Sequence, residues 1–442
     1  MLKAFVDIFK VPELKRRILV TIGILAAFRL GAAVPIPNID PEGLRALFEA
    51  HKGSLLGFLD MFSGGALSRL SIFSLGIMPY INASIIMSLL QGAHVLPYLD
   101  HLAKEGEHGR KKINQITRYA TVGLSMIQSF GLTMMIIKMP TPGGVPIVPD
   151  PSVGFIIITV LTVVTGTLLV MWLGEQITEF GIGNGISLII FAGIVDQLPG
   201  ATKNMFRLLR LEEITILASM FLVILVICVT AFVVWVETAQ RKIPVQYAKR
   251  IVGRKMYGGA STFLPIKVDQ AGVIAVIFAV AVLSAPLTLL QFFPAATWAQ
   301  KLTQFWTRGS VIYEIIFAGL IVFFCYFYNS IIINPNDLAD NMKKWGGFIS
   351  GIRPGETTAK YIQRIIERIT LGGALFVTCI AILPDLLRGW FNAPFFFGGT
   401  AILIVVGVSL DTIGQIESQM IMRHYEGFMK QGRIKGRWFN IK

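Results

Sequence analysis

The chain has 442 residues, a formal net charge of +14, 54% hydrophobic residues and only 15% charged residues. Soluble domains carry about 25% charged residues, so this composition excludes an ordinary soluble domain and indicates a polytopic membrane protein. Cys228, Cys325 and Cys379 each lie inside an apolar run. We therefore expect them to be small core residues rather than a disulfide framework or a metal cluster.

Apolar runs long enough to cross a membrane recur along the whole chain. The hydrocarbon core of a bilayer is about 30 Å thick and needs roughly 20 helical residues. The ten expected spans are approximately Ile18–Val34, Ile72–Leu90, Ile113–Ile137, Val153–Leu173, Ile182–Leu198, Ile214–Val236, Ala271–Phe292, Val311–Ile333, Ile369–Leu387 and Phe397–Ile416. The expected fold class is an all-α polytopic membrane protein. No small-residue cleavage site follows the first run, so we expect that span to stay in place.

Lysine and arginine are distributed unevenly over the segments between these spans. An even number of spans places both termini on one side, and that side holds 28 of these cations against ten on the other. Cytoplasmic loops carry the excess of positive charge, so we expect both termini to be cytoplasmic. One pair of loops departs from the rule: residues 174–181 hold no cation, whereas the next, external connection holds Lys203, Arg207 and Arg210.

Two long basic loops, Glu237–Gln270 and Asn334–Arg368, lie on the expected cytoplasmic side. A surplus of cations beside a membrane is often only topology information or attraction to anionic lipid. The alternative is a docking platform for a large partner with an acidic or RNA surface. Nothing in the loops themselves decides between these two interpretations.

The stretch Asp60–Gln91 combines two different kinds of segment. Its second half is apolar and long enough for a membrane helix, whereas Met61–Leu70 contains Gly64, Gly65 and Arg69 and is short and weakly helical. Broken backbone at membrane depth is tolerated only where protein buries it or where it lines a cavity. We therefore expect a half-helix folded into the interior of a pore.

Chemistry for ion coupling or catalysis is scarce in the spans. The ionisable candidates are expected at span ends or in a loop, as interfacial charges or one buried pair: Arg29, Glu175, Glu179, Asp196 and Glu237. No nucleotide-binding P-loop and no G-x-S-x-G motif occurs, so we expect neither an enzyme nor a bound cofactor. Three histidines recur every seven residues instead of at the i, i+4 spacing of helical metal ligands, which argues against a metal: His94, His101 and His108.

Isoleucine recurs at helical spacing in several spans. Ile81 and Ile85 share one helix face, as do Ile186 and Ile190, and later spans add Ile277 and Ile404. Such residues are most often ordinary core or lipid contacts. The alternative is a hydrophobic constriction, which gates by excluding water.

Seven ordered segments, spread along nearly the whole chain, resemble the SecY family of protein-conducting channels. They are RLGAAVPIPNID (Arg29–Asp40), FSGGALSRLSIFSLGIMPYINASII (Phe62–Ile86), KEGEHGRKKINQITRY (Lys104–Tyr119), GIGNGISLIIFAGIV (Gly181–Val195), QRKIPVQYAKR (Gln240–Arg250), NPNDLADNMKKWGGFISGIRPGETTAKYI (Asn334–Ile362) and FFGGTAILIVV (Phe396–Val406). The resemblance implies two inverted, pseudo-symmetric halves, residues 1–200 and 201–442, around a central pore. It implies translocation of unfolded secretory polypeptides and release of membrane-protein helices through a lateral gate.

The same resemblance implies roles for particular residues. The pore ring would be Ile81, Ile85, Ile186, Ile190, Ile277 and Ile404. The plug that closes the outer funnel would be Phe62, Ser63, Gly64, Gly65, Ala66, Leu67, Ser68, Arg69 and Leu70. The lateral gate would lie between the second span and the seventh to eighth spans, with polar groups at Asn82, Ser84, Ser88 and Gln91.

Partners are also implied by the resemblance. The basic loops would bind the ribosome, through rRNA contacts, or the SecA motor ATPase, using Arg241, Lys242, Lys249, Arg250, Arg254, Lys255, Lys343, Lys344 and Arg353. Small membrane subunits SecE and SecG, signal sequences, secretory polypeptides and membrane lipid complete the expected partners, in the plasma or inner membrane. A secondary transporter of small solutes is the rival interpretation, since a broken helix and an inverted repeat also suit one. A structural scaffold is a third, which leaves the half-helix unexplained.

Overall fold

The computed structural model describes residues 11–40, 43–44, 60, 63–93, 96–138, 147–149, 151–212, 215–247, 250–252, 255–257, 261–290, 302, 306, 310–391 and 399–431. Within these residues the fold is helical with a small amount of sheet. Phe62 of the expected plug, and Lys249 and Arg254 of the expected partner surface, lie outside the described residues.

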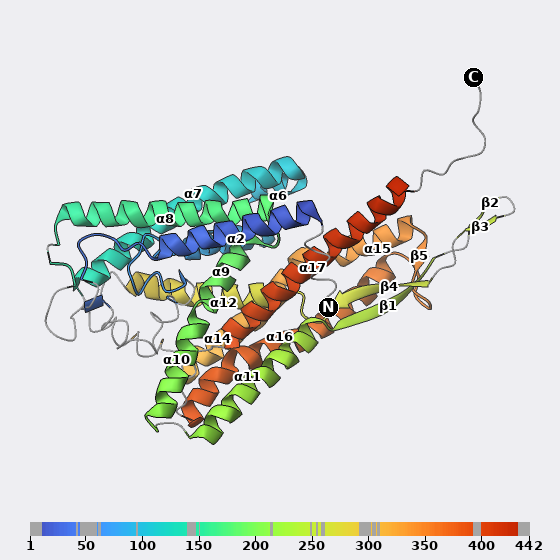
Figure 1. Cartoon of the computed structure of the whole chain (residues 1–442). Helices are drawn as coiled ribbons and strands as arrows, with labels where there is room; N and C mark the ends of the chain where they lie inside the picture. Colours follow the sequence, from blue (N-terminus) through green and yellow to red (C-terminus); the bar gives the residue numbers. More distant parts are fainter. Residues whose placement is uncertain are drawn as a thin grey trace.

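The first group of helices packs mainly on itself. It comprises α2 (Pro12–Ala32), α5 (Met78–Gly92), α6 (Pro97–Lys104), α7 (Glu107–Lys138), α8 (Val153–Phe180), α9 (Gly185–Val195) and α10 (Gln197–Arg210). Helix α7 packs between α5 and α8, and α2 packs against α8 and α9. Figure 1 shows α2, α7 and α8 running alongside one another, with α9 and α10 leading toward the rest of the chain.

The second group forms a similar cluster around α12, α14, α16 and α17. Its members are α11 (Ile216–Glu237), α12 (Gly272–Leu290), α14 (Val311–Ile332), α15 (Pro335–Lys344), α16 (Glu356–Phe391) and α17 (Gly399–Gln431). Contacts between the groups run chiefly from α5 and α7 to α12, from α9 to α17 and from α10 to α11. The boundary expected at residues 200 and 201 falls inside α10, and the inverted two-half organisation stays a prediction.

Seven helices of the described chain are long and apolar enough to span a membrane. Helices α2, α5 and α12 occupy the positions of the three other expected spans, so the ten-helix expectation is consistent with the fold. Large apolar side chains are exposed along α8, α11 and α14, and only Ser219 and Val233 of α11 are buried. An apolar helix surface of this kind requires lipid as its solvent.

Helix α8 ends later than the expected span, which ended at Leu173. Helix α8 continues to Phe180, so Glu175 and Glu179 lie on a helix and not in a loop, which corrects the sequence interpretation. The chain then turns within four residues, because Gly183 adopts a φ of +86° and the Asn184 side chain caps α9 by accepting from the N–H groups of Ile186 and Ser187.

A small antiparallel sheet links the two long basic loops. Strand β1 (Gln240–Tyr247) pairs along its length with β4 (Ser261–Lys267), and its end pairs with β5 (Gly347–Phe348). Strands β2 (Arg250–Val252) and β3 (Lys255–Tyr257) extend the hairpin. Ile243 and Val245 point inward and form a core with Ile362 and Ile366 of α16. The two long basic loops are therefore joined to each other through the pairing of β1 with β5.

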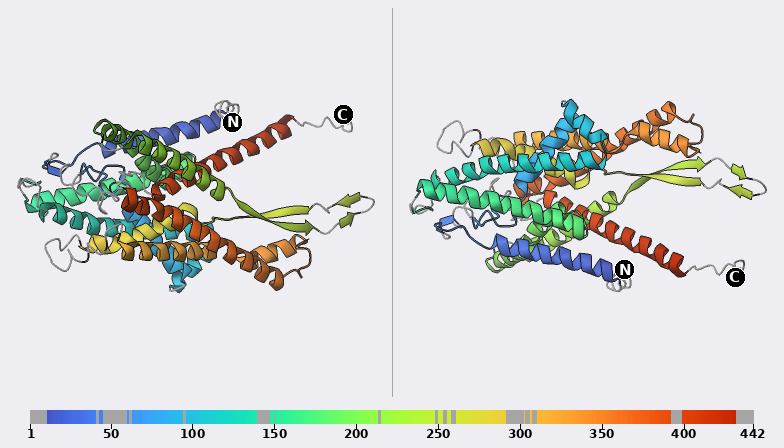
Figure 2. Two further views of the ribbon diagram at one scale, coloured as in Figure 1. Left: turned by 90° about the horizontal axis from the view of Figure 1, so that it is seen from below. Right: turned by 90° about the horizontal axis from the view of Figure 1, so that it is seen from above.

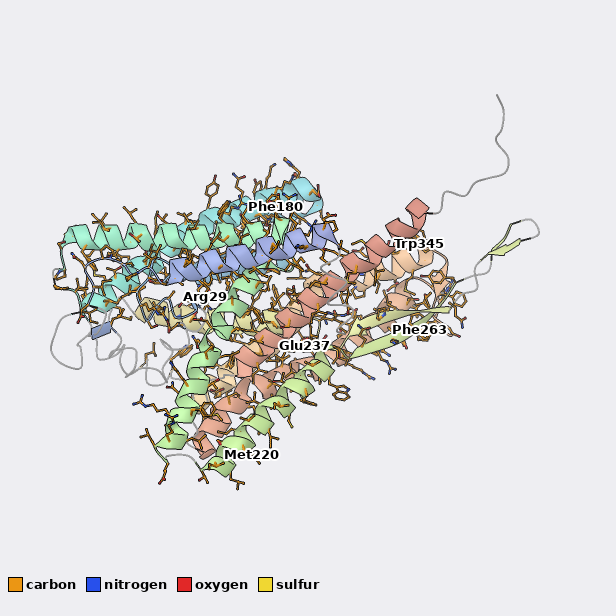
Figure 3. All side chains as sticks on the ribbon, viewed as in Figure 1. Arg29, Phe180, Met220, Glu237, Phe263 and Trp345 are labelled. Atoms are coloured by element: carbon orange, nitrogen blue, oxygen red, sulfur yellow. The ribbon has the colours of Figure 1, made fainter. Side chains whose placement is uncertain are left out.

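One end of the molecule collects the segments expected on the cytoplasmic side. The start of α2, the end of α17, the β1–β4 hairpin and α15 all project in the same direction (Figure 2). Trp345 and Phe263 stand out from this end (Figure 3), with 78% and 60% of their surfaces exposed. The basic segments separated in the sequence thus share one face of the fold.

Asp269 connects the sheet to the start of α12. Its side chain is buried, and its Oδ1 accepts a hydrogen bond from the backbone N–H of Gly272 at 2.7 Å. Burial raises the pKa of Asp269 to about 6, although the Gly272 hydrogen bond and Lys267 both act in the opposite direction. The folded chain therefore holds a proton here more tightly than the unfolded chain does.

We expect this residue to make the folded protein less stable as the pH rises from about 4 to about 6. At most, the two pKa values correspond to a loss on the order of 3 kcal/mol, present above pH 6 and absent below pH 4. Thermal unfolding of the Asp269→Asn protein over this pH range should lack that decline, whereas Asp337→Asn, at an exposed aspartate of α15, should retain it. An unchanged decline in Asp269→Asn would contradict the prediction.

Candidate functional site

The six isoleucines expected in the pore ring come from four helices and join one hydrophobic cluster. Ile81 and Ile85 lie on α5, Ile186 and Ile190 on α9, Ile277 on α12 and Ile404 on α17. Five are buried in the largest cluster of the described chain, and Ile186 packs against it partly buried. The structure therefore brings together residues that are more than 320 positions apart in the sequence.

The order of helix contacts explains how this cluster forms. Helix α5 packs on α12, α12 on α17, and α17 on α9, so each ring helix touches the next. The contacts that join the two helix groups are largely those of these four helices. The six isoleucines, called the isoleucine cluster below, are thus carried by the helices that join the two groups, where a pathway between the groups would be sealed.

The expected plug is packed inside the protein but is less helical than the sequence suggests. From Gly64 to Ile77 the backbone forms a run of turns and bends. Gly64, Gly65 and Gly76 have φ values of +68°, +77° and +54°, and Leu70 has a φ of +42°. These left-handed positions interrupt any continuous helix, so α5 begins at Met78, six residues after the expected start of its span.

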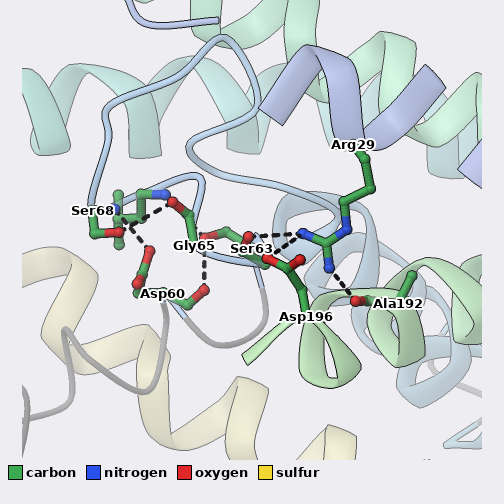
Figure 4. Close-up of polar contacts among 9 residues, drawn as sticks. Arg29, Asp60, Ser63, Gly65, Ser68, Ala192 and Asp196 are labelled. Atoms are coloured by element: carbon green, nitrogen blue, oxygen red, sulfur yellow. Dashed lines mark hydrogen bonds and ion pairs between the residues drawn. The ribbon is translucent and has the colours of Figure 1, made fainter. Parts of the chain in front are cut away.

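Hydrogen bonds within the plug hold these turns together. Asp60 Oδ1 accepts from the Ser68 N–H at 2.7 Å, and its carbonyl accepts from the Gly65 N–H at 2.9 Å (Figure 4). The Ser63 hydroxyl donates to the Asp60 carbonyl and accepts from the Leu67 N–H. The segment therefore has an internal polar framework that begins at Asp60.

Backbone hydrogen bonds attach the C-terminal end of the plug, here called its far end, to the residues that follow α2; the N-terminal end, around Gly64, is called its near end. At the far end, the Ile36 N–H donates to the Leu70 carbonyl and the Ile72 N–H donates to the Val34 carbonyl, at 2.9 and 3.1 Å. Phe73 stacks on Phe28 of α2 with ring centroids 5.8 Å apart. Between the ends, Ala66 joins the isoleucine cluster, while Leu67 and Leu70 enter a second apolar cluster.

Arg29 of α2 contacts the near end of the plug, a feature that the sequence analysis missed. Its Nη1 donates to the Gly64 carbonyl at 3.0 Å and lies 3.1 Å from the Asp196 carboxylate, and its Nη2 donates to the Ala192 carbonyl of α9 (Figure 4). The sequence interpretation allowed interfacial charges or a single buried pair. Arg29 and Asp196 do pair, but their side chains are 26% and 49% exposed, so the pair is not buried. Its link to the plug had no signal in the residue pattern.

The lateral gate is expected between α5 and the two helices of the seventh and eighth spans, α12 and α14. Asn82, Ser84, Ser88 and Gln91 are all half-buried on α5. Helix α5 packs on α12, and a Cβ at Gly92 would lie within 3 Å of Phe327 and Ile331 of α14. The second span therefore contacts both later spans named for the gate, while the gating role of the four polar residues stays a prediction.

Another charged contact not expected from the sequence joins α7 and α8. The Arg118 guanidinium donates from Nε and Nη2 to the two carboxylate oxygens of Glu175, each at 2.8 Å. Such a two-point pair fixes both side chains in orientation. Glu175, one of the few ionisable candidates from the sequence, therefore has a structural role in holding α7 to α8.

The expected partner-binding cations lie on the end formed by the basic loops. Arg241 and Lys242 are exposed on β1, Lys343 and Lys344 are exposed on α15, and Arg353 is exposed in the turn before α16. Arg250 and Lys255 belong to β2 and β3. The Thr358 hydroxyl donates to the Arg353 carbonyl at 2.9 Å, which fixes the backbone that carries this arginine.

Solved structures share this arrangement. A structure titled "The structure of a protein conducting channel" matches with a TM-score of 0.65 at 18% identity, over 94% of this chain and 96% of that chain. Sec61 in the canine ribosome-channel complex from the endoplasmic reticulum gives a TM-score of 0.61 at 17% identity, with the same coverage. The chain therefore has the fold of a protein-conducting channel.

Sequence comparisons identify the family. A SecY family model matches residues 71–413. The chain is 47% identical over 427 residues to protein translocase subunit SecY of Escherichia coli K12, covering 96% of both, and 45% identical over 425 residues to that of Aquifex aeolicus, covering 96% and 98%. The chain belongs to the SecY family of protein translocase subunits. This membership confirms the resemblance and the prediction that the chain is a multi-pass membrane channel and not an enzyme.

Proposed function

We propose that this chain forms the protein-conducting pore of a plasma or inner membrane, through which unfolded secretory polypeptides pass. The observation that carries this proposal is that the six isoleucines all lie in or against one large apolar core, on four helices that make most of the contacts between the two helix groups. A constriction lined by apolar side chains without charges excludes water and ions when it is closed. Its side chains can part around a polypeptide of any sequence, because they make no specific polar contact with it.

Opening would begin at α5. An apolar signal helix inserting between α5 and the α12–α14 pair would gain the order of 25 cal/mol per Å² of apolar surface removed from water. It favours the open state to the extent that it binds that state more tightly. The plug then moves aside, the isoleucines separate, and membrane-protein helices leave sideways through the same seam.

The basic end of the molecule is the surface we assign to the driving partner. The canine Sec61 channel is described in a complex with a ribosome, and exposed cations such as Arg241, Lys343 and Arg353 suit rRNA phosphates or the acidic groups of a SecA motor. Both termini would then be cytoplasmic. Residues 1–200 and 201–442 act as two inverted halves, held together by SecE and accompanied by SecG.

A crosslink to a translocating chain tests the path directly. Cysteine is placed at Ile81 in a background in which Cys228, Cys325 and Cys379 are replaced, and a secretory polypeptide with a single cysteine is stalled halfway through the reconstituted channel. After addition of a thiol oxidant, we expect a disulfide between the two only while the polypeptide is stalled. Cysteine at exposed Ile227 of α11, on the lipid-facing surface, is the matched control and should give no disulfide.

Two outcomes would redirect the proposal. Absence of crosslinks at Ile81, Ile190 and Ile277 while translocation continues would place the path elsewhere and make the isoleucine cluster ordinary core. Uptake of small solutes by vesicles that contain the channel and no motor would favour the transporter interpretation.

A further inference from the structure

Arg29 joins three parts of the molecule that would have to move relative to one another during opening. It belongs to α2, it donates to the Gly64 carbonyl of the plug, and it donates to the Ala192 carbonyl of α9. Asp196, which follows α9, pairs with the same guanidinium at 3.1 Å. Ala192 lies two residues beyond Ile190, so this contact is adjacent to the isoleucine cluster.

Glycines allow the plug and α9 to meet at this point. A Cβ at Gly64 would lie 3.0 Å from Arg29 Nη1 and 3.1 Å from the Gly193 Cα, and the φ of Gly64 is +68°. A side chain at Gly64 would therefore separate the plug backbone from α9 or displace the guanidinium. The close approach brings the Gly64 and Ala192 carbonyls within reach of one arginine.

The guanidinium is suited to this position because of its shape. Its planar, forked set of N–H groups can donate to two carbonyls and a carboxylate at once, whereas a lysine ammonium is a single point of charge. The Arg29 side chain is 26% exposed, so its hydrogen bonds are partly shielded from water and salt. Figure 4 shows the Arg29 side chain extending from α2 toward Ala192 and Asp196.

We propose that Arg29 is a latch that holds the plug closed and links its release to movement of α9. The inference rests on the proposed function of residues 62–70 as a plug. The far end of the segment is held by backbone hydrogen bonds to Val34 and Ile36 and by the Phe28–Phe73 stack, and acts as the hinge. The near end is held to α2 and α9 through Arg29. When a polypeptide displaces Ile190, α9 shifts and the Arg29 contacts break.

The latch predicts that loss of Arg29 frees the plug in the idle channel. Leu67 is buried at 4% exposure, so a cysteine there reports plug displacement through its rate of alkylation by a membrane-impermeant maleimide. In full-length, cysteine-replaced channels in vesicles, Arg29→Met should raise that rate by about tenfold or more, the effect of losing a hydrogen bond to a charged donor. Arg29→Lys should give an intermediate rate, because one ammonium replaces only part of the fork.

Two further variants make the result specific. Arg207→Met removes the same charge from an exposed position on α10 and should leave the alkylation rate unchanged. Asp196→Asn keeps the guanidinium but removes its carboxylate, and should raise the rate by less than Arg29→Met; it serves as the test if Arg29→Met does not assemble. In every variant, a bound signal peptide should raise the rate to the same final value.

The experiment separates failure of the latch from failure of the plug assignment. If a signal peptide speeds alkylation of the Leu67→Cys channel but Arg29→Met and Asp196→Asn match Arg207→Met, the plug moves and Arg29 does not hold it. If a signal peptide leaves the alkylation rate unchanged in all variants, residues 62–70 are not a movable plug, and the proposed opening is wrong.

Discussion

Replacing Ile190 by asparagine is expected to raise the ion conductance of the idle channel by at least about tenfold. An amide buried without a hydrogen-bond partner costs about 1–3 kcal/mol, and water entering the constriction removes that cost, so the wet state is favoured. Ile190 is 1% exposed and belongs to the isoleucine cluster on α9. Ions cross a hydrophobic constriction only when it is wet. Conductance of vesicle-reconstituted channels in planar bilayers, without a signal peptide, measures the effect.

The neighbouring residue provides a matched control for Ile190. Ile189 is also 1% exposed, but its Cδ1 lies 3.4 Å from the Cβ position of Gly174 on α8, within the first helix group. Ile189→Asn should therefore lower thermal stability to a similar degree while leaving the idle conductance unchanged. Equal leaks from the two variants would show that any damage to α9 opens the channel, and that Ile190 has no special place in the seal.

Replacing Arg353 by glutamate is expected to reduce motor-driven translocation by about tenfold or more, since reversing one charge at a close ion pair costs several kcal/mol in binding. The side chain is exposed, and Thr358 fixes its backbone, so the folded channel should tolerate the change. ATP-dependent import of a secretory precursor into vesicles with purified motor measures the loss. The amount of assembled channel should equal that of the unchanged protein.

A second arginine on the same end tests whether position or charge matters. Arg364 is exposed on α16, about two turns after its start at Glu356, and Arg364→Glu makes the same change in net charge. It should reduce translocation by much less than Arg353→Glu. Equal losses would indicate that the basic end attracts its partner only by general charge, and normal import by Arg353→Glu would remove this residue from the coupling surface.

The sequence predicts the membrane fold because hydropathy leaves few alternatives. Apolar runs of 20 residues or so must become helices in lipid, where every backbone N–H and C=O needs an internal partner. Nine of the ten expected spans overlap helices that begin within a few residues of them or extend beyond them; Ile72–Leu90 is the clearest departure. There, Gly76 at a φ of +54° delays α5 to Met78, and a glycine in an apolar run does not by itself reveal its φ.

The features missed from the sequence depend on partners that are distant along the chain. Arg29 and Ala192 are 163 residues apart, and Arg118 and Glu175 are 57 apart, so neither contact leaves a local pattern. The β1–β4 hairpin was missed because cations and two prolines, Pro244 and Pro265, interrupt its alternation. Of its side chains, Ile243, Val245 and Ile266 are fully buried in the core. For the ring and plug residues, the family resemblance supplied the roles, and the crosslinking and conductance experiments test them.

The separation of the isoleucine cluster from the basic end has a consequence for ionic strength. Added salt shortens the range of charge attraction from roughly 10 Å at 0.1 M to roughly 3 Å at 1 M. Its cations also compete with the lysines and arginines of the protein for binding to phosphate. The isoleucine cluster contains no charge for salt to screen. One preparation taken through a salt titration should therefore lose a partner bound to the basic end while remaining sealed. Exchange of partners on that face would then not require the membrane seal to open.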